Sequence, residues 1–183
     1  MVSDFRKKKL LHVFNVFFDI NRSGTIDQKD FEDAASKIAQ LRGWKAGDPK
    51  YKEAHDTLMK IWVGLQGKAD KDQDNQVSAD EWISMWDEYA KNPSSPLDWQ
   101  TLYCKFIFEL EDASSDGSID SDEFSTVYAS FGLDQQESKT AFQKMSKGNS
   151  NVSWAQFQEL WREYFTSEDT NAPGNFIFGK TQY

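Results

Sequence analysis

The stretch Asp70-Lys71-Asp72-Gln73-Asp74-Asn75-Gln76-Val77-Ser78-Ala79-Asp80-Glu81 decides how this chain of 183 residues folds. Acidic side chains stand at positions 1, 3, 5 and 12 of the stretch, an apolar residue stands at position 8, and amphipathic segments flank both ends. A short loop between two helices that wraps a hard cation in oxygen ligands has this spacing. The stretch therefore predicts a calcium-binding helix-loop-helix unit.

Two further segments, residues 19–30 and 112–123, repeat the pattern, so three loops are expected to bind one divalent cation each. A solvated turn would explain one acidic loop, but it does not explain three loops in register. The predicted metal-binding residues, which offer side-chain or backbone oxygens, are Asp19, Asn21, Ser23, Thr25, Asp27 and Asp30 in the first loop, Asp70, Asp72, Asp74, Gln76 and Glu81 in the second, and Asp112, Ser114, Asp116, Ser118 and Glu123 in the third.

A fourth copy, residues 145–156, has lost its ligands. Met145 stands at position 1 and Lys147 at position 3, and neither a thioether nor an ammonium group binds a hard cation. We expect this loop to be empty and to serve as a structural partner. Paired loops join through a short ladder at position 8, which predicts that Ile26 pairs with Val77 and that Ile119 pairs with Val152.

Two active loops depart from the ideal pattern. Asp30 holds position 12 of the first loop, and its shorter side chain reaches an ion less easily in bidentate fashion than glutamate does. We therefore expect a six-coordinate first site that tolerates Mg²⁺ better than the others. Asn75 holds position 6 of the second loop, where the other two have Gly24 and Gly117. The turn requires a positive φ, which asparagine adopts more readily than most residues.

The linker 91–96, with two prolines and two serines, is expected to break the helix before it and divide the chain. We predict an all-α fold of four helix-loop-helix units: an N-terminal pair in residues 1–91, a C-terminal pair in 98–165, and a tail in 166–183. Phe176, Ile177 and Phe178 are too apolar for a free terminus, so the tail is expected to dock between the two pairs. Asp134 with Glu137 and Ser153 with Gln156 predict capping boxes.

Composition narrows the functional classes. The net charge of -9 argues against nucleic-acid binding, which requires a basic face. The single cysteine, Cys104, excludes an intrachain disulfide and favours a reducing compartment. The N-terminus is unlike a signal peptide, Val2 excludes myristoylation, and no apolar run approaches the roughly 18 residues of a membrane span. We therefore expect a cytoplasmic monomer without a transmembrane segment, in which the basic run 6–9 forms a solvated face.

The tail carries a second motif. Gly174, Gly179, Lys180 and Thr181 match the phosphate-binding pattern G-x-x-x-x-G-K-[ST], which makes them candidate nucleotide-binding residues. The pattern works when a strand precedes it and a helix follows it, because the N-terminus of that helix holds the phosphates. Only two residues follow Thr181, so the residues alone favour a structural tail.

The whole chain resembles the calexcitins and the related invertebrate sarcoplasmic calcium-binding proteins, which belong to the EF-hand class. The resemblance rests on three active loops with an inactive fourth, on the linker Asn92-Pro93-Ser94-Ser95, and above all on the ending Asn171-Ala172-Pro173-Gly174-Asn175-Phe176-Ile177-Phe178-Gly179. Within this group the sequence is most similar to the insect branch described as juvenile hormone diol kinase. That branch implies Mg²⁺, ATP or GTP as cofactors and a sesquiterpenoid diol as substrate in the core groove.

Two functions follow, and they remain open at this point. In the first, the protein is a kinase, with a nucleotide held by Lys180 and the glycines of the tail. In the second, it is a cytosolic calcium buffer or sensor without chemistry. The resemblance favours the kinase, whereas the residues themselves favour the buffer. The only histidines are His12 and His55, and the sequence indicates no catalytic base.

Overall fold

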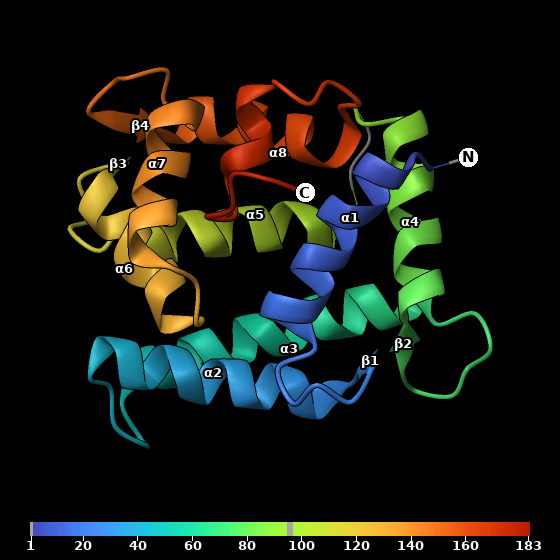
Figure 1. Cartoon of the computed structure of the whole chain (residues 1–183). Helices are drawn as coiled ribbons and strands as arrows, with labels where there is room; N and C mark the ends of the chain where they lie inside the picture. The colour runs from blue at the N-terminus through green and yellow to red at the C-terminus, as the bar shows by residue number, and fades with distance from the viewer. Residues whose placement is uncertain (1, 95–96) are drawn as a thin grey trace. The chain divides into compact units, whose positions relative to one another are not determined.

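A computed structural model describes residues 2–94 and 97–183, and within them the chain forms eight α-helices and four short strands (Figure 1). The elements are α1 Asp4–Val13, a π-helical turn Phe14–Phe18, β1 Thr25–Ile26, α2 Gln28–Arg42, α3 Pro49–Ala69, β2 Val77–Ser78, α4 Ala79–Lys91, α5 Asp98–Glu111, β3 Ser118–Asp120, α6 Ser121–Ser130, α7 Gln135–Met145, β4 Asn151–Ser153, α8 Trp154–Thr166 and a 3₁₀ turn η2 Pro173–Phe176. The predicted all-α class is confirmed. Part of the predicted linker, Ser95 and Pro96, lies outside the described residues.

Contacts divide the chain into two compact units. The N-terminal unit is Leu10–Tyr103, and the C-terminal unit combines Met1–Lys9 with Cys104–Tyr183. The linker predicts a different division, into 1–91 and 98–165 with a tail in 166–183. The contacts instead place residues 1–9 in the C-terminal unit and residues 98–103 in the N-terminal unit. The difference arises because a helix belongs to the core that its side chains contact, and a helix break marks only where the chain can turn.

The N-terminal unit joins its two loops through the predicted ladder. β1 pairs with β2 in antiparallel register, with Ile26 opposite Val77 and both side chains fully buried. Helices α2 and α3 pack side by side (Figure 1). The Trp82 indole is buried with them, and its Nε1 donates to the Leu10 carbonyl at 2.9 Å. The ladder and this aromatic core fix the spacing of the first two loops.

The first helix is shorter than its apolar periodicity predicts. Apolar residues recur at helical spacing up to Phe18, but the α-helix ends at Val13 and a π-helical turn follows. The Asp19 amide bonds to the Phe14 carbonyl at 2.7 Å, which closes this wider turn. Phe14, Phe17 and Phe18 are buried as the periodicity requires, so the wider turn still presents its rings to the core.

The C-terminal unit repeats the arrangement with the third and fourth loops. β3 pairs with β4, and Ile119 lies opposite Val152 as predicted. Helices α6 and α7 pack together, and the tail lies against α7 and α8 within the same unit (Figure 1). The predicted docking of the apolar tail is confirmed here, since Ile177 and Phe178 have no exposed surface. Its placement between the two units remains a prediction.

The basic run at the start of α1 is only half solvated, so the expectation of a solvated face is wrong for Arg6 and Lys9. Both are buried, whereas Lys7 and Lys8 are exposed. The Arg6 guanidinium donates to the Phe165 carbonyl at 3.2 Å. The Lys9 ammonium donates to the Ser167 carbonyl and to Asn175 Oδ1, each at 2.9 Å. These two cations hold α1 against the end of α8 and the tail.

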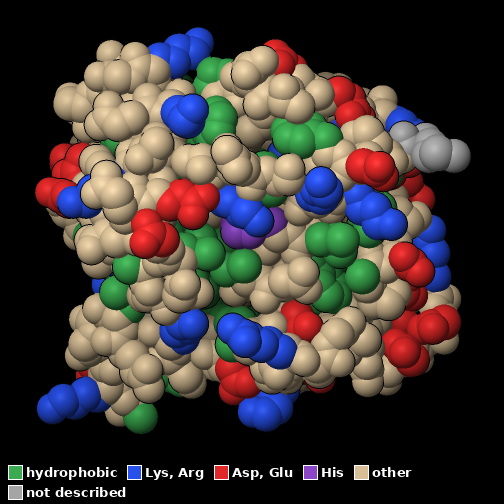
Figure 2. Space-filling view, in the orientation of Figure 1, with side chains coloured by type: hydrophobic (Ala, Val, Ile, Leu, Met, Phe, Trp, Pro, Cys, Tyr) green, Lys and Arg blue, Asp and Glu red, His purple; other side chains and the backbone are tan. Residues whose placement is uncertain are grey.

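On the face drawn in Figure 2, the basic side chains of the described residues lie among acidic ones rather than in a continuous basic patch. Among the helices of the described ranges 2–94 and 97–183, none combines the length and the apolar character that crossing a bilayer requires.

Candidate metal centre

The three active loops share one internal hydrogen-bond frame. In each, the aspartate at position 1 accepts from the backbone amides of positions 5 and 6, which folds the loop back over its first carboxylate. The donors lie at 2.9 and 2.8 Å for Asp19 (Ser23 and Gly24), at 3.2 and 3.0 Å for Asp70 (Asp74 and Asn75), and at 3.2 and 3.0 Å for Asp112 (Asp116 and Gly117). Since the same frame forms from three different sequences, the loop spacing determines it.

The predicted turn at position 6 is confirmed in all three loops. The φ angles are 91° at Gly24, 64° at Asn75 and 87° at Gly117, so asparagine does adopt the conformation that glycine provides elsewhere. A second positive φ occurs at position 4, at Arg22, Gln73 and Ser115. Sequence reasoning missed these three positions because arginine, glutamine and serine carry no strong left-handed preference that would reveal them.

Position 12 has two roles in each active loop. Its carboxylate forms a capping box with the residue at position 9, which is the N-cap of the following helix. It also reaches back across the loop: Asp30 Oδ1 accepts from the Asn21 amide at 3.2 Å, Glu81 Oε1 from Lys71 at 3.0 Å, and Glu123 Oε2 from Ser114 at 2.9 Å. The loop and its exiting helix therefore share one carboxylate.

Carboxylates converge in the second and third loops. The oxygens of Asp70, Asp72 and Asp74 lie within 4.8 Å of one another, and so do those of Asp112, Asp116 and Glu123. Like charges at such separations repel, and a divalent cation among them removes the repulsion. The candidate ligand atoms are all hard carboxylate oxygens, and Ca²⁺ binds ligands of this kind. These two sites fit the predicted metal.

The first loop assembles a less acidic set of predicted ligands. Ser23 Oγ lies 3.2 Å from Asp19 Oδ1 and 2.9 Å from the Thr25 carbonyl, and the Ser23 amide donates to Asn21 Oδ1 at 3.0 Å. The structure thus places Asp19, Asn21, Ser23 and Thr25 around one point. Such a mix of carboxylate, amide, hydroxyl and carbonyl oxygens is also chemistry that Ca²⁺ accepts.

The first loop also differs electrostatically from the second. Asp30 is 1% exposed, and burial raises its pKa to about 6, an effect that the charges of Asp27 and Asp19 reinforce. Burial acts in the same direction on Glu81, but hydrogen bonds from Ser78 and Lys71 hold the pKa of that carboxyl below its usual value. A proton therefore competes for Asp30 at a higher pH than for Glu81.

The remaining predicted ligands, at positions 3 and 7 of their loops, make polar contacts with neighbouring residues. The backbone amide of Gln76 donates to Asp74 Oδ1 at 2.9 Å, and the side-chain Oε1 of Gln76 accepts from the Thr25 hydroxyl at 2.8 Å. The first and second loops are therefore linked by a polar contact as well as by the ladder. Ser114 and Ser118 in the third loop contact the carboxylates of Asp112 and Asp116.

The fourth loop follows a different path. Met145 is buried, and positive φ angles fall at Lys147 and Gly148, at positions 3 and 4 rather than 4 and 6. The predicted capping box of Ser153 and Gln156 is present in full. The loop thus retains the ladder and the helix cap while it lacks the carboxylates that the other three share.

The tail motif is occupied by protein contacts. The amides of Gly174 and Thr181 donate to the carboxylates of Glu163 and Glu137, and the Gly179 amide bonds to the Phe176 carbonyl. The first glycine is the second residue of a 3₁₀ turn that begins at Pro173, and the element before that turn is the helix α8 rather than a strand. A phosphate-binding loop offers its amides to an anion, whereas these amides already face carboxylates. The arrangement does not fit a phosphate cradle.

The glycines of the motif have a packing reason instead. A β-carbon on Gly174 would lie 2.5 Å from the Leu160 carbonyl, so only glycine lets the tail approach α8 this closely.

Thr181 also explains why the predicted capping box of Asp134 and Glu137 is only half formed. Asp134 accepts from the Glu137 amide, but the Glu137 carboxylate accepts from the amide and hydroxyl of Thr181, each at 3.1 Å.

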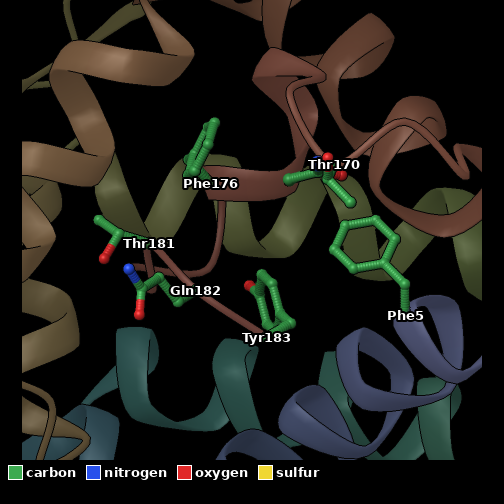
Figure 3. A pocket seen from close by; sticks show the side chains of 7 residues that line it. Phe5, Thr170, Phe176, Thr181, Gln182 and Tyr183 are labelled. Atoms are coloured by element: carbon green, nitrogen blue, oxygen red, sulfur yellow. The ribbon is translucent and has the colours of Figure 1, made fainter.

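A pocket of about 300 Å³ lies beside the end of the tail (Figure 3). Phe5, Phe176 and Tyr183 supply aromatic walls, and the other lining side chains, Thr181 among them, are uncharged and polar. Lys180, the lysine of the motif, places its ammonium 5.5 Å from the centroid of the Tyr183 ring. The pocket therefore offers no charged lining for a triphosphate.

The loops, their ladders and their caps define an EF-hand calcium-binding protein, and the sequence profile described as "EF hand" matches residues 67–86, around the second loop. Calexcitin-1 of Caenorhabditis elegans is 32% identical, over 97% of this chain and 88% of its own length. Sarcoplasmic calcium-binding proteins II, V, VI and VII of Branchiostoma lanceolatum are 28% identical, over 98% of both chains. The solved sarcoplasmic calcium-binding protein of amphioxus superposes with a TM-score of 0.81 at 27% identity, over 98% of this chain and 99% of that one.

The chain belongs to the family of calexcitins and sarcoplasmic calcium-binding proteins. The predicted resemblance to this family is confirmed over nearly the whole chain. The sarcoplasmic relatives are calcium-binding proteins by name, and none of these matches supports the juvenile hormone diol kinase branch.

Proposed function

We propose that this protein is a cytoplasmic calcium buffer or sensor that binds one Ca²⁺ in each of the loops 19–30, 70–81 and 112–123. The observation that carries the proposal is the common frame of the three loops. In each, the carboxylate at position 1 orders the loop backbone and the carboxylate at position 12 joins the loop to its exiting helix. The family supports the same function.

The chain's own residues prepare each site before the ion arrives. Backbone amides hold the first carboxylate in place, so little loop entropy remains to be lost on binding. The ion, when bound, supplies the positive charge that the converging carboxylates lack. The first two loops share the β1–β2 ladder, so binding in one is expected to favour the conformation that the other needs.

The first site is proposed to accept Mg²⁺ as well as Ca²⁺. Asp30 at position 12 is shorter than Glu81 and Glu123, and it is already held by the amides of Asn21 and Asp27. A compact octahedral ion suits a monodentate ligand at this position better than the larger Ca²⁺ does.

The buried thiol of Cys104 fits a reducing compartment, which is the basis for the proposed cytoplasmic location of a monomer.

The kinase alternative depends on the tail motif and on the adjoining pocket. A nucleotide would need the backbone amides of the tail to bind its phosphates. Two of these amides already donate to the carboxylates of Glu163 and Glu137. Calcium binding without phosphoryl transfer therefore fits the observed contacts better. Phosphorylation of a sesquiterpenoid diol by purified protein with Mg²⁺ and ATP or GTP, lost in Lys180→Ala, would restore the kinase interpretation.

The calcium proposal is tested by isothermal titration of the full chain. We expect three Ca²⁺ per wild-type chain and two in each of the variants Asp19→Asn, Asp70→Asn and Asp112→Asn. Asp80→Asn is the matched control, because Asp80 is an exposed residue of the second loop at position 11, outside the ligand set. If a position 1 variant still binds three Ca²⁺, the assignment of its loop is overturned. If the wild type binds fewer than three, the assignment of three sites is overturned.

A further inference from the structure

The third calcium loop is continuous with the helix that carries its last ligand. Glu123 lies in the first turn of α6, and Phe124 and Tyr128 follow on the buried side of the same helix. The rings of Phe124 and Tyr128 lie 4.6 Å apart between centroids, and both residues are at most 1% exposed. A shift of Glu123 toward or away from the loop must therefore move Tyr128 within a packed core.

Tyr128 is also where the tail meets this helix. Its hydroxyl donates to the Ile177 carbonyl at 2.8 Å, and Ile177 is fully buried. Gly179 has a φ of 78°, and a β-carbon there would lie 3.0 Å from Cγ of the Tyr128 ring. The tail backbone thus lies against both the hydroxyl and the ring of one side chain.

The entering helix of the same loop also ends in this unit. Glu111, the last residue of α5, directly precedes Asp112 and has no exposed surface. The tail is further held on α7, where Glu137 accepts two hydrogen bonds from Thr181.

We infer that Tyr128 is a positioning residue that couples the C-terminal tail to calcium binding in residues 112–123, so that docking of the tail and binding of the ion stabilise each other. The tail is docked in the same conformation in which the oxygens of Asp112, Asp116 and Glu123 converge within 4.8 Å. Any contact present only when the ligands are assembled raises the affinity for the ion, and the ion must stabilise that contact equally. The inference rests on the proposed calcium site in the third loop.

The test is a calcium titration of the ¹⁵N-labelled full chain, with free calcium set by a chelator buffer. The amide signal of Gly117 reports the third loop and that of Gly24 the first, because each donates to the position 1 carboxylate of its own loop. In Tyr128→Phe we expect a three- to tenfold weaker Kd at Gly117, in the range of a single buried hydrogen bond, and an unchanged Kd at Gly24. Calcium should also slow hydrogen exchange of the Gly179 and Thr181 amides, less so in the variant.

Tyr164→Phe is the matched control, since the Tyr164 hydroxyl is equally buried in the same unit and donates to the Lys9 carbonyl, whereas the Tyr128 hydroxyl donates to Ile177. It should leave the Kd at Gly117 unchanged. A second pair approaches from the tail side: Gly179→Ala introduces strain and a contact with Tyr128, whereas Gly132→Ala introduces the same backbone strain with nothing within 4 Å. Only Gly179→Ala should weaken binding at Gly117.

The outcomes separate the coupling from the site itself. If the Gly117 amide of the wild type does not respond to calcium, both the site and the coupling are wrong. If it responds, but Tyr128→Phe and Gly179→Ala bind as tightly as their controls, calcium binding stands and the coupling is overturned. Weaker binding at Gly117 in Tyr164→Phe to the same degree would also overturn it, because it would show a general loss of stability.

Discussion

Asp120 and Glu123 hold each other at the start of α6: the Glu123 amide donates to Asp120 Oδ1 at 2.8 Å, and the Asp120 amide donates to Glu123 Oε1 at 3.3 Å. Glu123 thus caps the helix and is also the last predicted ligand of the third loop. Gln156 holds the same place in the fourth loop with its capping box intact. The fourth loop therefore shows that glutamine preserves the cap without the ligand charge.

Glu123→Gln should separate these two roles. The metal-free protein should keep its free energy of unfolding to within about 0.5 kcal/mol, because the capping box survives. Calcium affinity at the third loop should fall on the order of 100-fold, since one of its charged ligands is lost. Urea denaturation with chelator and calcium titration of the Gly117 amide measure the two effects. Equal loss of stability and of binding would show that the carboxylate acts through the fold rather than on the ion.

Exchanging the residues at position 12 should exchange ion preference. Asp30→Glu in the first loop should raise the ratio of Ca²⁺ to Mg²⁺ affinity by about tenfold, because the longer side chain reaches the larger ion with both oxygens. Glu123→Asp in the third loop is the reverse swap and should lower that ratio. Competition titrations followed at the Gly24 and Gly117 amides report each loop separately. No difference in Mg²⁺ competition between the first loop and the other two in the wild type would contradict the prediction.

The buried ammonium of Lys9 should give stability an unusual rise in mild alkali. Burial, with the nearby Arg6 charge, lowers the pKa of Lys9 to about 8 from its usual 10.5. The unfolded chain then binds more protons between pH 8 and pH 10.5, so the free energy of unfolding rises with pH in that window. Below pH 8 the cost of the buried charge is fully present.

Urea denaturation of the calcium-loaded protein at pH 7.5, 8.5 and 9.5 measures this slope. We expect wild type to gain about 1–2 kcal/mol relative to Lys9→Met across that range. Lys9→Met is also less stable overall, because the Ser167 carbonyl and Asn175 Oδ1 lose their donor. Lys8→Met is the control, since Lys8 is exposed and should leave the slope as it is in wild type. Parallel curves for wild type and Lys9→Met would refute the buried-charge account.

Two glycines of α3 should respond in opposite ways to alanine. A β-carbon at Gly64 would lie 2.5 Å from Cβ of Trp99, whereas one at Gly67 would meet nothing within 4 Å. Gly64→Ala should therefore destabilise by about 1–3 kcal/mol through overpacking. Gly67→Ala should stabilise by up to about 1 kcal/mol, because alanine is the better helix former. Thermal unfolding with saturating calcium compares the pair, and similar midpoints would disprove the close contact.

The loops could be predicted in detail because their information is local. All predicted ligands of one site lie within twelve consecutive residues, and the turn at position 6 needs only a residue that tolerates a positive φ. Ile26 opposite Val77 and Ile119 opposite Val152 followed from the same register. The ligand residues proposed for these loops were likewise chosen from spacing, and they stay a prediction.

The tail motif shows where local pattern misleads. Gly174, Gly179, Lys180 and Thr181 match a phosphate-binding sequence letter by letter. The amides of Gly174 and Thr181 are nevertheless held by Glu163 and Glu137, which lie elsewhere in the C-terminal unit, and the Gly179 amide is held by Phe176 within the tail itself. Glycine was needed at position 174 to approach α8, and a motif cannot distinguish this reason from the approach of a ligand.

By sequence alone, the stretch 70–81 and its repeats determined the four helix-loop-helix units and their pairing. They also determined the three proposed metal sites. Each of these features depends on neighbours along the chain. The tertiary structure decided that Arg6 and Lys9 are buried, that Glu137 serves the tail rather than its own helix cap, and that Tyr128 joins the third loop to Ile177. These contacts link residues up to 166 positions apart. Their partners are chosen by the packing of the folded core, which no short spacing encodes.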